Sequence, residues 1–381
     1  MPRMLPPLTA QITPGIAELE TRAWDALTGG SCCVSHAMLS SLEDSGSVGA
    51  GTGWHPQHLS LREDDALVAA MPLYQKTHSY GEYVFDWAWA DAYQRHGLAY
   101  YPKWLSAVPF TPVPGPRLLA GNAAHMAALA RAARMLAEDS GLSSMHVLLP
   151  REAEARTLAE AGFMLRSGVQ FHWHNRGYAC FEDFLASLNH SKRKKIRQER
   201  RRAAEHGLRY EWLDGHQAED ADWRFFHHCY ATTYALHRST PYLTPAFFPL
   251  LAERMPDNVR LLLARRDGQP VAGAFYLLDG EALYGRYWGA TESLPFLHFE
   301  LCYYQAIEHC ITHGIARFEG GAQGEHKLSR GLEPVVTYSA HWLRDERFAD
   351  AVEHFLARER EGIGFYLDEL DDRSPFRRAQ A

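Results

Sequence analysis

The sequence lacks the features that mark disulfide scaffolds, zinc modules and membrane spans. Its six cysteines include no pair at C-x-x-C spacing, and scattered cysteines are typical of a reduced, cytoplasmic protein. No apolar run approaches the ~18 residues of a membrane-spanning helix. The N-terminal stretch MPRMLPPLTAQITPG has no apolar segment after its arginine, which argues against a signal peptide. We therefore expect a cytoplasmic protein without a membrane span.

A strong charge of one sign is also absent. The formal net charge is −7, which argues against a general nucleic-acid-binding protein. The charge is uneven, however, because residues 191–209 hold nine Lys or Arg against two Glu. This segment predicts one local anion-binding site. His172 and His174 would make only half a zinc site, and we predict no metal.

One pattern of predicted elements occurs twice in the chain. Residues 58–73 and 261–276 each read as strand, tight turn and strand. A third strand, a helix and a short strand follow each time, at 81–89, 123–141 and 145–149 in the first half and at 281–290, 297–314 and 316–320 in the second.

The repeated order β-β-β-α-β predicts an α/β (α+β) protein with two tandem domains, residues 1–170 and 171–381. Each domain is expected to be a mixed, mainly antiparallel sheet flanked by helices. One large α+β domain whose hairpins look alike by chance is the alternative.

A basic helix is expected to open the second domain. It would run from an N-cap at Ser191 to Gly207, after a short helix at 181–188. So many like charges repel one another unless an anion is near. The candidate phosphate or anion ligands are Lys192, Arg193, Lys194 and Arg197, for a nucleotide, a CoA tail or the acceptor end of a transfer RNA. A solvated surface helix is the alternative.

The stretch FEGGAQGEHKLSRGLEP, residues 318–334, carries the densest chemistry of the chain. An amine that attacks an ester or thioester needs a base, donors for the oxyanion and a way to hold both substrates. Glu319 and Glu325 are candidate bases, and His326 is a candidate proton shuttle. Gly320 and Gly321 would let backbone amides approach a ligand, and Lys327 and Arg330 would hold a carboxylate or phosphate. A glycine-rich turn with solvated charges is the alternative.

Further candidates lie near the start of the 297–314 helix and before the turn at 239–241. His298 should share a helix face with Cys302, whereas Glu300 should share one with Tyr303 and Tyr304. His298 and Glu300 are thus either catalytic or part of a buried polar network, with one of them inside and the other solvated. The remaining candidates for substrate binding are Arg238 and Tyr287.

Several stretches resemble the FemAB-like group of predicted N-acyltransferases, a Fem-type branch of the GNAT acyltransferase superfamily linked to peptidoglycan biosynthesis. They are SYGEYVFDWAWADAY (79–93), HSKRKKIRQERR (190–201), PYLTPAFF (241–248), YWGATES (287–293), LHFELCYYQAIEHCI (297–311) and EGGAQGEHKLSRGLEPVVTYSAHW (319–342). The resemblance implies two GNAT-like domains and transfer of an acyl or aminoacyl group to an amine. It implies direct attack, without a covalently bound cofactor.

The donor stays open at this point. Characterised Fem transferases use aminoacyl-tRNA and a peptidoglycan-precursor amine, whereas ordinary GNAT enzymes use acyl-CoA. The sequence lacks the Q/R-x-x-G-x-G/A loop of the second group and the coiled-coil arm of the first. The acceptor is expected to be a small-molecule or peptide amine. A tRNA-dependent aminoacyl ligase and a non-catalytic module that binds cell-wall or nucleic-acid ligands are the alternatives.

Overall fold

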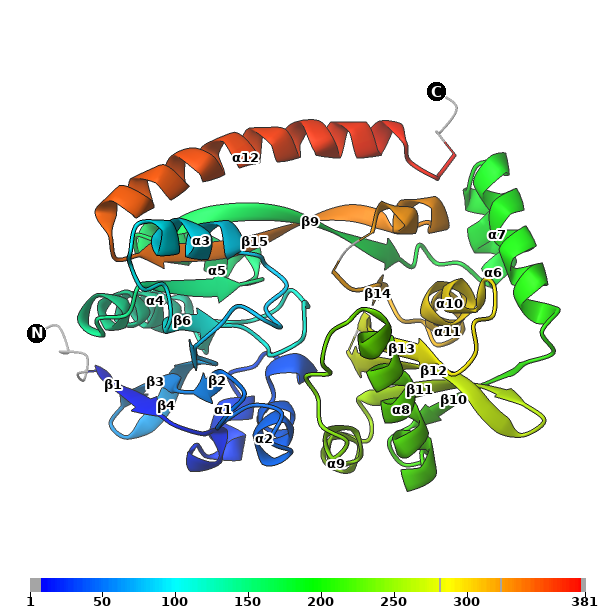
Figure 1. Cartoon of the computed structure of the whole chain (residues 1–381), viewed down its shortest axis with the longest axis horizontal. Helices are drawn as coiled ribbons and strands as arrows, with labels where there is room; N and C mark the ends of the chain where they lie inside the picture. Colours follow the sequence, from blue (N-terminus) through cyan, green and yellow to red (C-terminus); the bar gives the residue numbers. More distant parts are fainter. Residues whose placement is uncertain (1–7, 281, 323, 378–381) are drawn as a thin grey trace, which may run out of the picture. The chain divides into compact units, whose positions relative to one another are not determined.

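The computed structural model describes residues 8–280, 282–322 and 324–377 (Figure 1). The chain forms two compact units: unit 1 comprises Met1–Gly168 and Val336–Gly364, and unit 2 comprises Val169–Val335 and Phe365–Ala381. The predicted boundary between residues 170 and 171 lies two residues from the first crossing. The two predicted domains are each one continuous stretch of sequence, whereas the chain returns to unit 1 at Val336. The chain crosses within two long strands, β9 (Met164–His174) and β15 (Glu333–Leu343).

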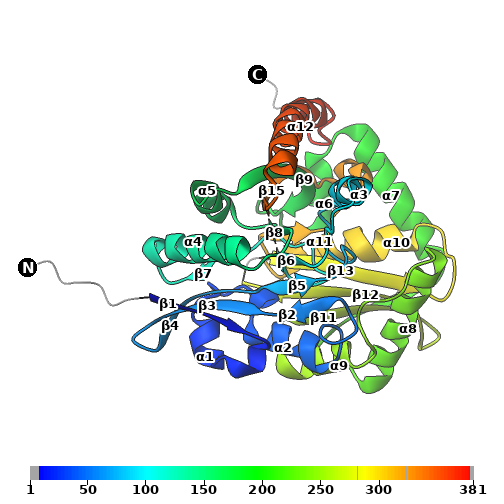
Figure 2. The same ribbon diagram turned by 60° about the vertical axis from the view of Figure 1, so that its left-hand side comes forward.

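The strands of unit 1 form two series. The first is antiparallel, in the order β1 (Leu8–Thr13), β3 (His58–Glu63), β4 (Ala66–Met71) and β7 (Leu119–Ala120). The second runs from β15 through β8 (Ser144–Leu148), β6 (Lys103–Ser106) and β5 (Tyr74–Lys76) to β2 (Trp54–Pro56). Helices α1 (Thr21–Asp25) and α2 (His36–Asp44) lie on one side of β3 and β4, and α4 (Ala123–Asp139) lies on the other (Figure 2).

The helix predicted at 123–141 is confirmed as α4. Leu129, Ala130, Ala133 and Ala137 are fully buried at helical spacing and pack against β3 and β4. The helix ends where predicted, because Gly141 takes the left-handed conformation with φ 75°. The short strand expected at 145–149 is β8, and α5 (Glu152–Glu160) follows it.

The third strand predicted at 81–89 is wrong. No strand forms there, and α3 (Trp87–Arg95) begins within the segment. Its aromatic residues favour a strand by propensity. However, Trp89 and Tyr93 are four residues apart and both buried, in one apolar cluster with Leu343 of β15. Packing at helical spacing has overridden the local preference.

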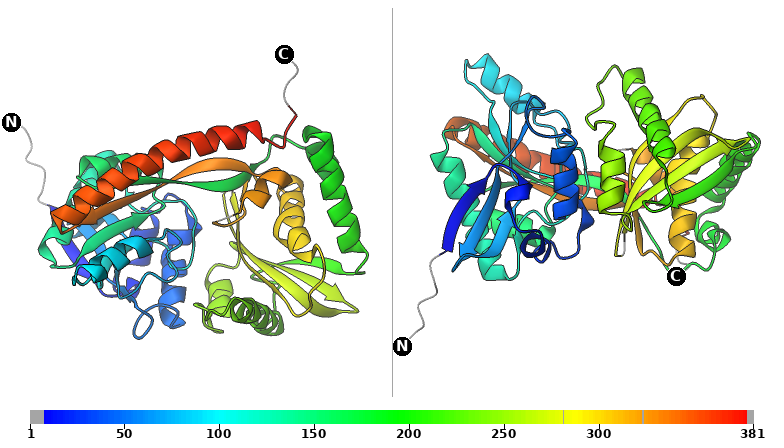
Figure 3. Two further views of the ribbon diagram at one scale, coloured as in Figure 1. Left: turned by 45° about the horizontal axis from the view of Figure 1, so that its top comes forward. Right: turned by 90° about the horizontal axis from the view of Figure 1, so that it is seen from below.

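Unit 2 is built on one sheet in the order β10 (Arg209–Asp214), β11 (Val259–Arg266), β12 (Gln269–Asp279), β13 (Ala282–Ala290), β14 (Arg317–Glu319) and β9. One face is covered by α8 (Asp220–Leu236), with α9 (Phe247–Arg254) packed on α8. The other face carries α10 (Leu297–Phe299), the π-helical turn η3 (Glu300–Tyr304) and α11 (Gln305–Thr312). Figure 3 shows these helices on opposite sides of the strands. The sheet and helix predicted for the second half are thus confirmed, and Gly314 ends the helix with φ 67°.

The predicted basic helix exists but begins and ends earlier. Helix α7 spans His190–Ala204 and follows α6 (Phe181–Ser187). Its N-cap is Asn189, whose side-chain oxygen accepts the Lys192 backbone N–H at 3.1 Å. The predicted cap, Ser191, instead donates its hydroxyl to Asn189 at 2.9 Å. Asn189 directly precedes the first helical residue, so its side chain can reach the third backbone N–H of the helix. Ser191 already lies within the helix and cannot cap it.

The remaining long element is α12 (Glu346–Asp372), which follows β15. Two short helical turns matter for the site: η4 (Glu325–Arg330) connects β14 to β15, and η3 interrupts the helix described above. Among the described residues, no helix is both long and apolar enough to cross a membrane.

Candidate active site

Strands β13 and β14 separate after three residue pairs. They run parallel from Ala282 opposite Arg317 to Tyr284 opposite Glu319, whereas β13 continues to Ala290. Beyond Tyr284, this edge of β13 has no strand neighbour within the part of the chain that the structure describes. Backbone N–H and C=O groups on that edge need partners, and a ligand can supply them.

A pocket of about 110 Å³ opens where the two strands separate. This β13–β14 pocket has walls from β12 and β13, from the helix that begins at Leu297, and from the glycines after β14. Its lining residues are Ala274, Phe275, Tyr276, Gly285, Arg286, Tyr287, Trp288, His298, Cys302, Tyr303, Gly320 and Gly321. The fold therefore brings together four predicted residues that are far apart in the sequence: Tyr287, His298, Gly320 and Gly321.

The π-helical turn decides which side chains enter this pocket. His298 and Cys302 share a face as expected, but Tyr303 joins them instead of facing the same way as Glu300. A π turn accommodates an extra residue, so the side chains that follow shift around the helix axis. Glu300 and Tyr304 face α7, where they contact Arg200 and Glu199. Such single π turns occur frequently at functional sites.

His298 is the ionisable side chain best placed to act in the pocket. Its half-buried ring lies 4.5 Å from the Trp288 ring and 5.7 Å from the Tyr303 ring, centre to centre. Burial, together with the nearby His326 and Arg330, lowers the pKa of His298 to about 4. The imidazole is therefore neutral at pH 7. Neither ring nitrogen has a hydrogen-bond partner in residues 8–280, 282–322 and 324–377.

A second imidazole is held beside the pocket. His326 Nε2 lies 2.9 Å from the Tyr303 hydroxyl. Burial lowers the pKa of His326 and raises that of Tyr303, so at neutral pH the hydroxyl keeps its proton and donates it to the ring. Gly324 is required here, because a Cβ at that position would lie 2.3 Å from the His326 ring. Sequence reasoning missed Tyr303, since tyrosines at helical spacing more often belong to a core.

Glu319 is buried at the end of β14, next to the pocket but not in its lining. It is 4% exposed, and one carboxylate oxygen accepts a hydrogen bond from Arg317 Nε at 2.9 Å. The other oxygen lies 3.7 Å from His172 Nε2 and has no hydrogen-bond partner among the described residues. Burial raises the pKa of Glu319 to about 7, although Arg317 opposes the shift. A carboxyl group with this pKa can exchange protons at neutral pH.

Lys327 and Arg330 are engaged by the protein itself. Each is 2% exposed. Lys327 Nζ donates to the carbonyl of Gly321 at 2.7 Å, which fixes the glycine turn, and burial lowers the pKa of Lys327 to about 8. Arg330 forms an ion pair with Glu199 of α7 at 3.0 Å and lies 3.5 Å from the centre of the Phe299 ring. The charge of Arg330 is thus already paired within the fold, and its predicted role in holding a carboxylate or phosphate stays a prediction.

Three other predicted residues lie away from the β13–β14 pocket. Glu300 is buried, neither solvated nor in this pocket, and its carboxylate pairs with Arg200 of α7 at 3.0 Å. Glu325 is exposed and pairs with Arg373 at 3.2 Å. Arg238 is exposed just after α8. The structure thus gives Glu300 and Glu325 ion-pairing roles and places Arg238 at the surface.

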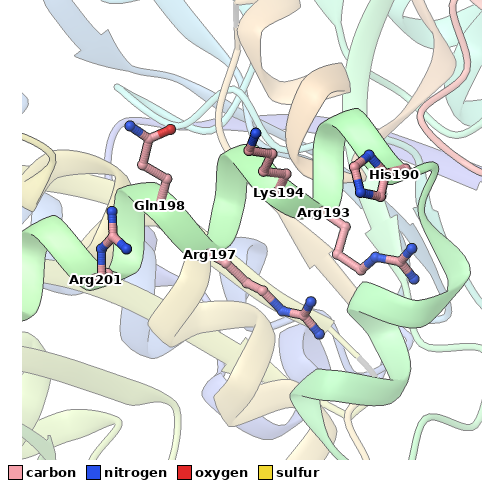
Figure 4. A pocket seen from close by; sticks show the side chains of 6 residues that line it. All are labelled: His190, Arg193, Lys194, Arg197, Gln198 and Arg201. Carbon is pink, nitrogen blue, oxygen red and sulfur yellow. The ribbon is translucent and has the colours of Figure 1, made fainter.

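The outer face of α7 forms an open hollow of about 640 Å³. Figure 4 shows the six side chains that line it: His190, Arg193, Lys194, Arg197, Gln198 and Arg201. Three of the four predicted anion ligands are among them. The fourth, Lys192, points elsewhere and donates to the Ser329 hydroxyl at 3.2 Å.

A family model matches residues 15–378 of the chain: FemAB_like, described as peptidoglycan biosynthesis/recognition. Solved structures with the same arrangement include FemX, at 10% identity and a TM-score of 0.55, which covers 88% of this chain and 98% of that one.

Two further solved structures are similar to this chain. The C-terminal domain of a putative lysylphosphatidylglycerol synthetase from Agrobacterium fabrum matches at 12% identity and a TM-score of 0.56, covering 90% and 97% of the two chains. L-PGS from Bacillus licheniformis matches at 9% identity and 0.52, covering 84% and 94%. At these identities the likeness shows the fold alone, a mixed α/β arrangement. No curated protein matches.

Proposed function

The chain belongs to the FemAB_like family of transferases linked to peptidoglycan, and on that basis we propose that it is an N-acyltransferase that moves an acyl or aminoacyl group onto an amine. The observation that carries this proposal is His298, a neutral imidazole without a hydrogen-bond partner among the described residues, in the wall of the pocket where β13 leaves β14. A base of this kind is what an attacking amine requires.

In the proposed reaction the amine nitrogen of the acceptor attacks the carbonyl carbon of the donor ester or thioester. His298 takes the proton that the amine loses as the new C–N bond forms. The negative charge on the carbonyl oxygen is met by backbone N–H groups on the free edge of β13 and at Gly320 and Gly321. This oxyanion in turn raises the proton affinity of the nearby imidazole.

Collapse of the intermediate breaks the bond to the leaving thiol or hydroxyl. We assign its proton to the Tyr303–His326 pair, which is hydrogen-bonded at 2.9 Å beside the pocket. Tyr303 gives a proton to the leaving group and is reprotonated from water through His326, while His298 releases to water the proton that it took from the amine. Glu319, which directly precedes Gly320, is an alternative general base. Direct attack needs no covalently bound cofactor, and both candidate donors, acyl-CoA and aminoacyl-tRNA, are made in the cytoplasm, where we place the reaction.

The test is replacement of His298 by asparagine, with His309→Asn as the matched control. His309 lies on the same helical segment, and burial likewise lowers its pKa to about 4, but it stacks on Trp212 outside the pocket. Substrates are first identified by mass spectrometry of small molecules that co-purify with the protein. Transfer is then measured with acyl-CoA thioesters by thiol release and with aminoacyl-tRNA by radiolabel.

We expect His298→Asn to lower kcat by about 10²- to 10⁴-fold, the usual contribution of general-base catalysis, with an unchanged melting temperature. His309→Asn should keep the activity of the natural protein. Equal turnover of the two variants would remove His298 from the reaction. Turnover lost with His309→Asn alone would point to a site elsewhere in unit 2.

A further inference from the structure

Unit 2 contains another pocket that the proposed chemistry does not use. It has a volume of about 440 Å³ and lies between α6, α7, β10 and the π-helical turn. We name it the α6–α7 pocket. One part of its wall is apolar, made by Phe181, Leu185, Ala204 and the ring of Tyr210. Another part is polar, made by Glu300 and Gln305, whose side chains are hydrogen-bonded to each other at 2.8 Å.

The α6–α7 pocket and the basic hollow on α7 adjoin each other. Arg197 and Arg201 line both of them. At the mouth, Arg197 is paired with Glu182 at 2.5 Å. The side chains of Arg193, Lys194 and Arg201 have no carboxylate within 4.0 Å in the described parts of the chain. Three unpaired cations on about two turns of helix repel one another, and an anion there would stabilise them.

The interior of the α6–α7 pocket has a different character from its mouth. Its one inward-facing cation, Arg200, is neutralised by Glu300 at 3.0 Å and Glu308 at 2.7 Å. The Arg200 guanidinium lies 4.4 Å from the centre of the Phe181 ring, which makes a flat surface. The mouth of the pocket therefore carries unpaired positive charge. Inside, the charge of Arg200 is paired, and most of the remaining wall is aromatic and aliphatic.

A ligand that matches this gradient has phosphate at one end and a flat, partly polar ring at the other. We propose that the hollow and the α6–α7 pocket together bind an adenine nucleotide. Its phosphates would meet Arg193, Lys194 and Arg201. Its base would lie against Phe181 and Tyr210, with the exocyclic amine toward the Glu300 carboxylate. A polyanion without a base would use the mouth alone.

The inference rests on the proposed function in one respect: the nucleotide is taken to be part of the acyl donor. CoA, one of the two candidate donors, carries such a group far from its thioester, since it contains adenosine 3′-phosphate 5′-diphosphate. Nucleotide binding itself requires no turnover, so it can be measured apart from acyl transfer. His298→Asn should bind the nucleotide as tightly as the natural protein does.

The experiment uses the full chain and isothermal titration with adenosine 3′,5′-bisphosphate, inorganic pyrophosphate, CoA and deacylated tRNA. Arg201→Gln removes one unpaired cation, and Arg202→Gln is its control. The guanidinium of Arg202 lies 5.8 Å from the Phe296 ring and lines neither hollow nor pocket. Ala204→Trp fills the α6–α7 pocket from an exposed position without changing the charge.

We expect the bisphosphate nucleotide to bind more tightly than pyrophosphate and to lose about tenfold in affinity with Arg201→Gln, but less than twofold with Arg202→Gln. Ala204→Trp should abolish the preference for the nucleotide and leave pyrophosphate binding unchanged. Tighter binding of CoA, or of tRNA with a steep salt dependence, then identifies the donor.

Equal affinity for pyrophosphate and nucleotide, unaffected by Ala204→Trp, would overturn the assignment of a base site. Stronger binding to phosphatidylglycerol vesicles, competing with the nucleotide, would instead make α7 a membrane-surface helix. If the protein transfers acyl groups but does not bind the nucleotide, only the inference of a nucleotide site is refuted. If the protein binds the nucleotide but shows no detectable acyl transfer, only the proposed function is refuted.

Discussion

Replacing Arg330 by methionine should destabilise unit 2, because this arginine is one half of a buried ion pair. Its Nη2 lies 3.0 Å from Glu199 Oε2 and 3.1 Å from Oε1, and Nη1 donates to the His326 carbonyl at 2.8 Å. Glu199 is 5% exposed. Without Arg330 its carboxylate would keep, among the residues that the structure describes, only the Tyr304 hydroxyl as a close partner. Lys195 Nζ stands 4.0 Å away.

Removing one partner of a buried ion pair typically costs about 3–5 kcal/mol, because the other charge stays buried without compensation. For a unit of roughly 150–250 residues, each kcal/mol shifts the melting temperature by about 2–4 °C. The expected fall for Arg330→Met is therefore ~6–20 °C. The double variant Arg330→Met with Glu199→Gln should regain part of this loss, since no buried charge is left unpaired.

Differential scanning calorimetry of the full chain measures these shifts. Arg373→Met is the control, because its ion pair with Glu325 is exposed on both sides and should leave the melting temperature unchanged. An Arg330→Met protein that melts within ~1 °C of the natural one would refute the reasoning. If that protein also needed far more acceptor for half-maximal rate, the prediction that Arg330 holds a carboxylate or phosphate of the substrate would be supported.

Two further perturbations test other parts of unit 2. Burial raises the pKa of Glu319 from 4.5 to about 7 in the folded chain, so its stabilising contribution is full below the unfolded pKa and is lost as the pH rises through about 7. Urea unfolding across this range should show a flatter pH dependence for Glu319→Gln; identical slopes would contradict the shift. Gly289→Ala would put a Cβ 2.2 Å from the Cys229 carbonyl oxygen of α8 and should lower the melting temperature, whereas Gly362→Ala in α12, with open space around it, should raise it slightly. An unchanged melting temperature for Gly289→Ala would mean that α8 can move away from β13 without loss of stability.

The sequence predicted those elements whose signals are local. The hairpin at 261–276 has a tight turn between apolar runs, and both its strands and its turn are confirmed. The helix at 297–314 ends at a glycine, as expected. The segment 81–89 failed because its aromatic residues suit a strand by composition, and only the burial of Trp89 and Tyr93 four residues apart reveals the helix.

The candidate site was less accessible to sequence reasoning because its geometry depends on distant pairs. Arg330 and Glu199 are 131 residues apart, so the sequence around the glycine-rich stretch does not indicate that the arginine forms an ion pair. The π-helical turn redirected Tyr303 toward His326, and no residue pattern in LHFELCYY specifies that turn. By contrast, His298 and Cys302 share the predicted face and both line the pocket.

Unit 1 also has buried charged side chains, and it engages Lys103 and Arg117 within the fold. Lys103 is fully buried and forms ion pairs with Glu82, at 2.8 Å, and Asp86. Arg117 donates to three backbone carbonyls, among them that of Leu148 at 2.9 Å. A group that must meet substrate would first have to break such contacts, at a cost comparable to the catalysis it could supply. In unit 2 the imidazole of the β13–β14 pocket and three cations of α7 have no such partners among the described residues. A reaction therefore needs the least rearrangement there, which favours unit 2 as the place of the proposed acyl transfer.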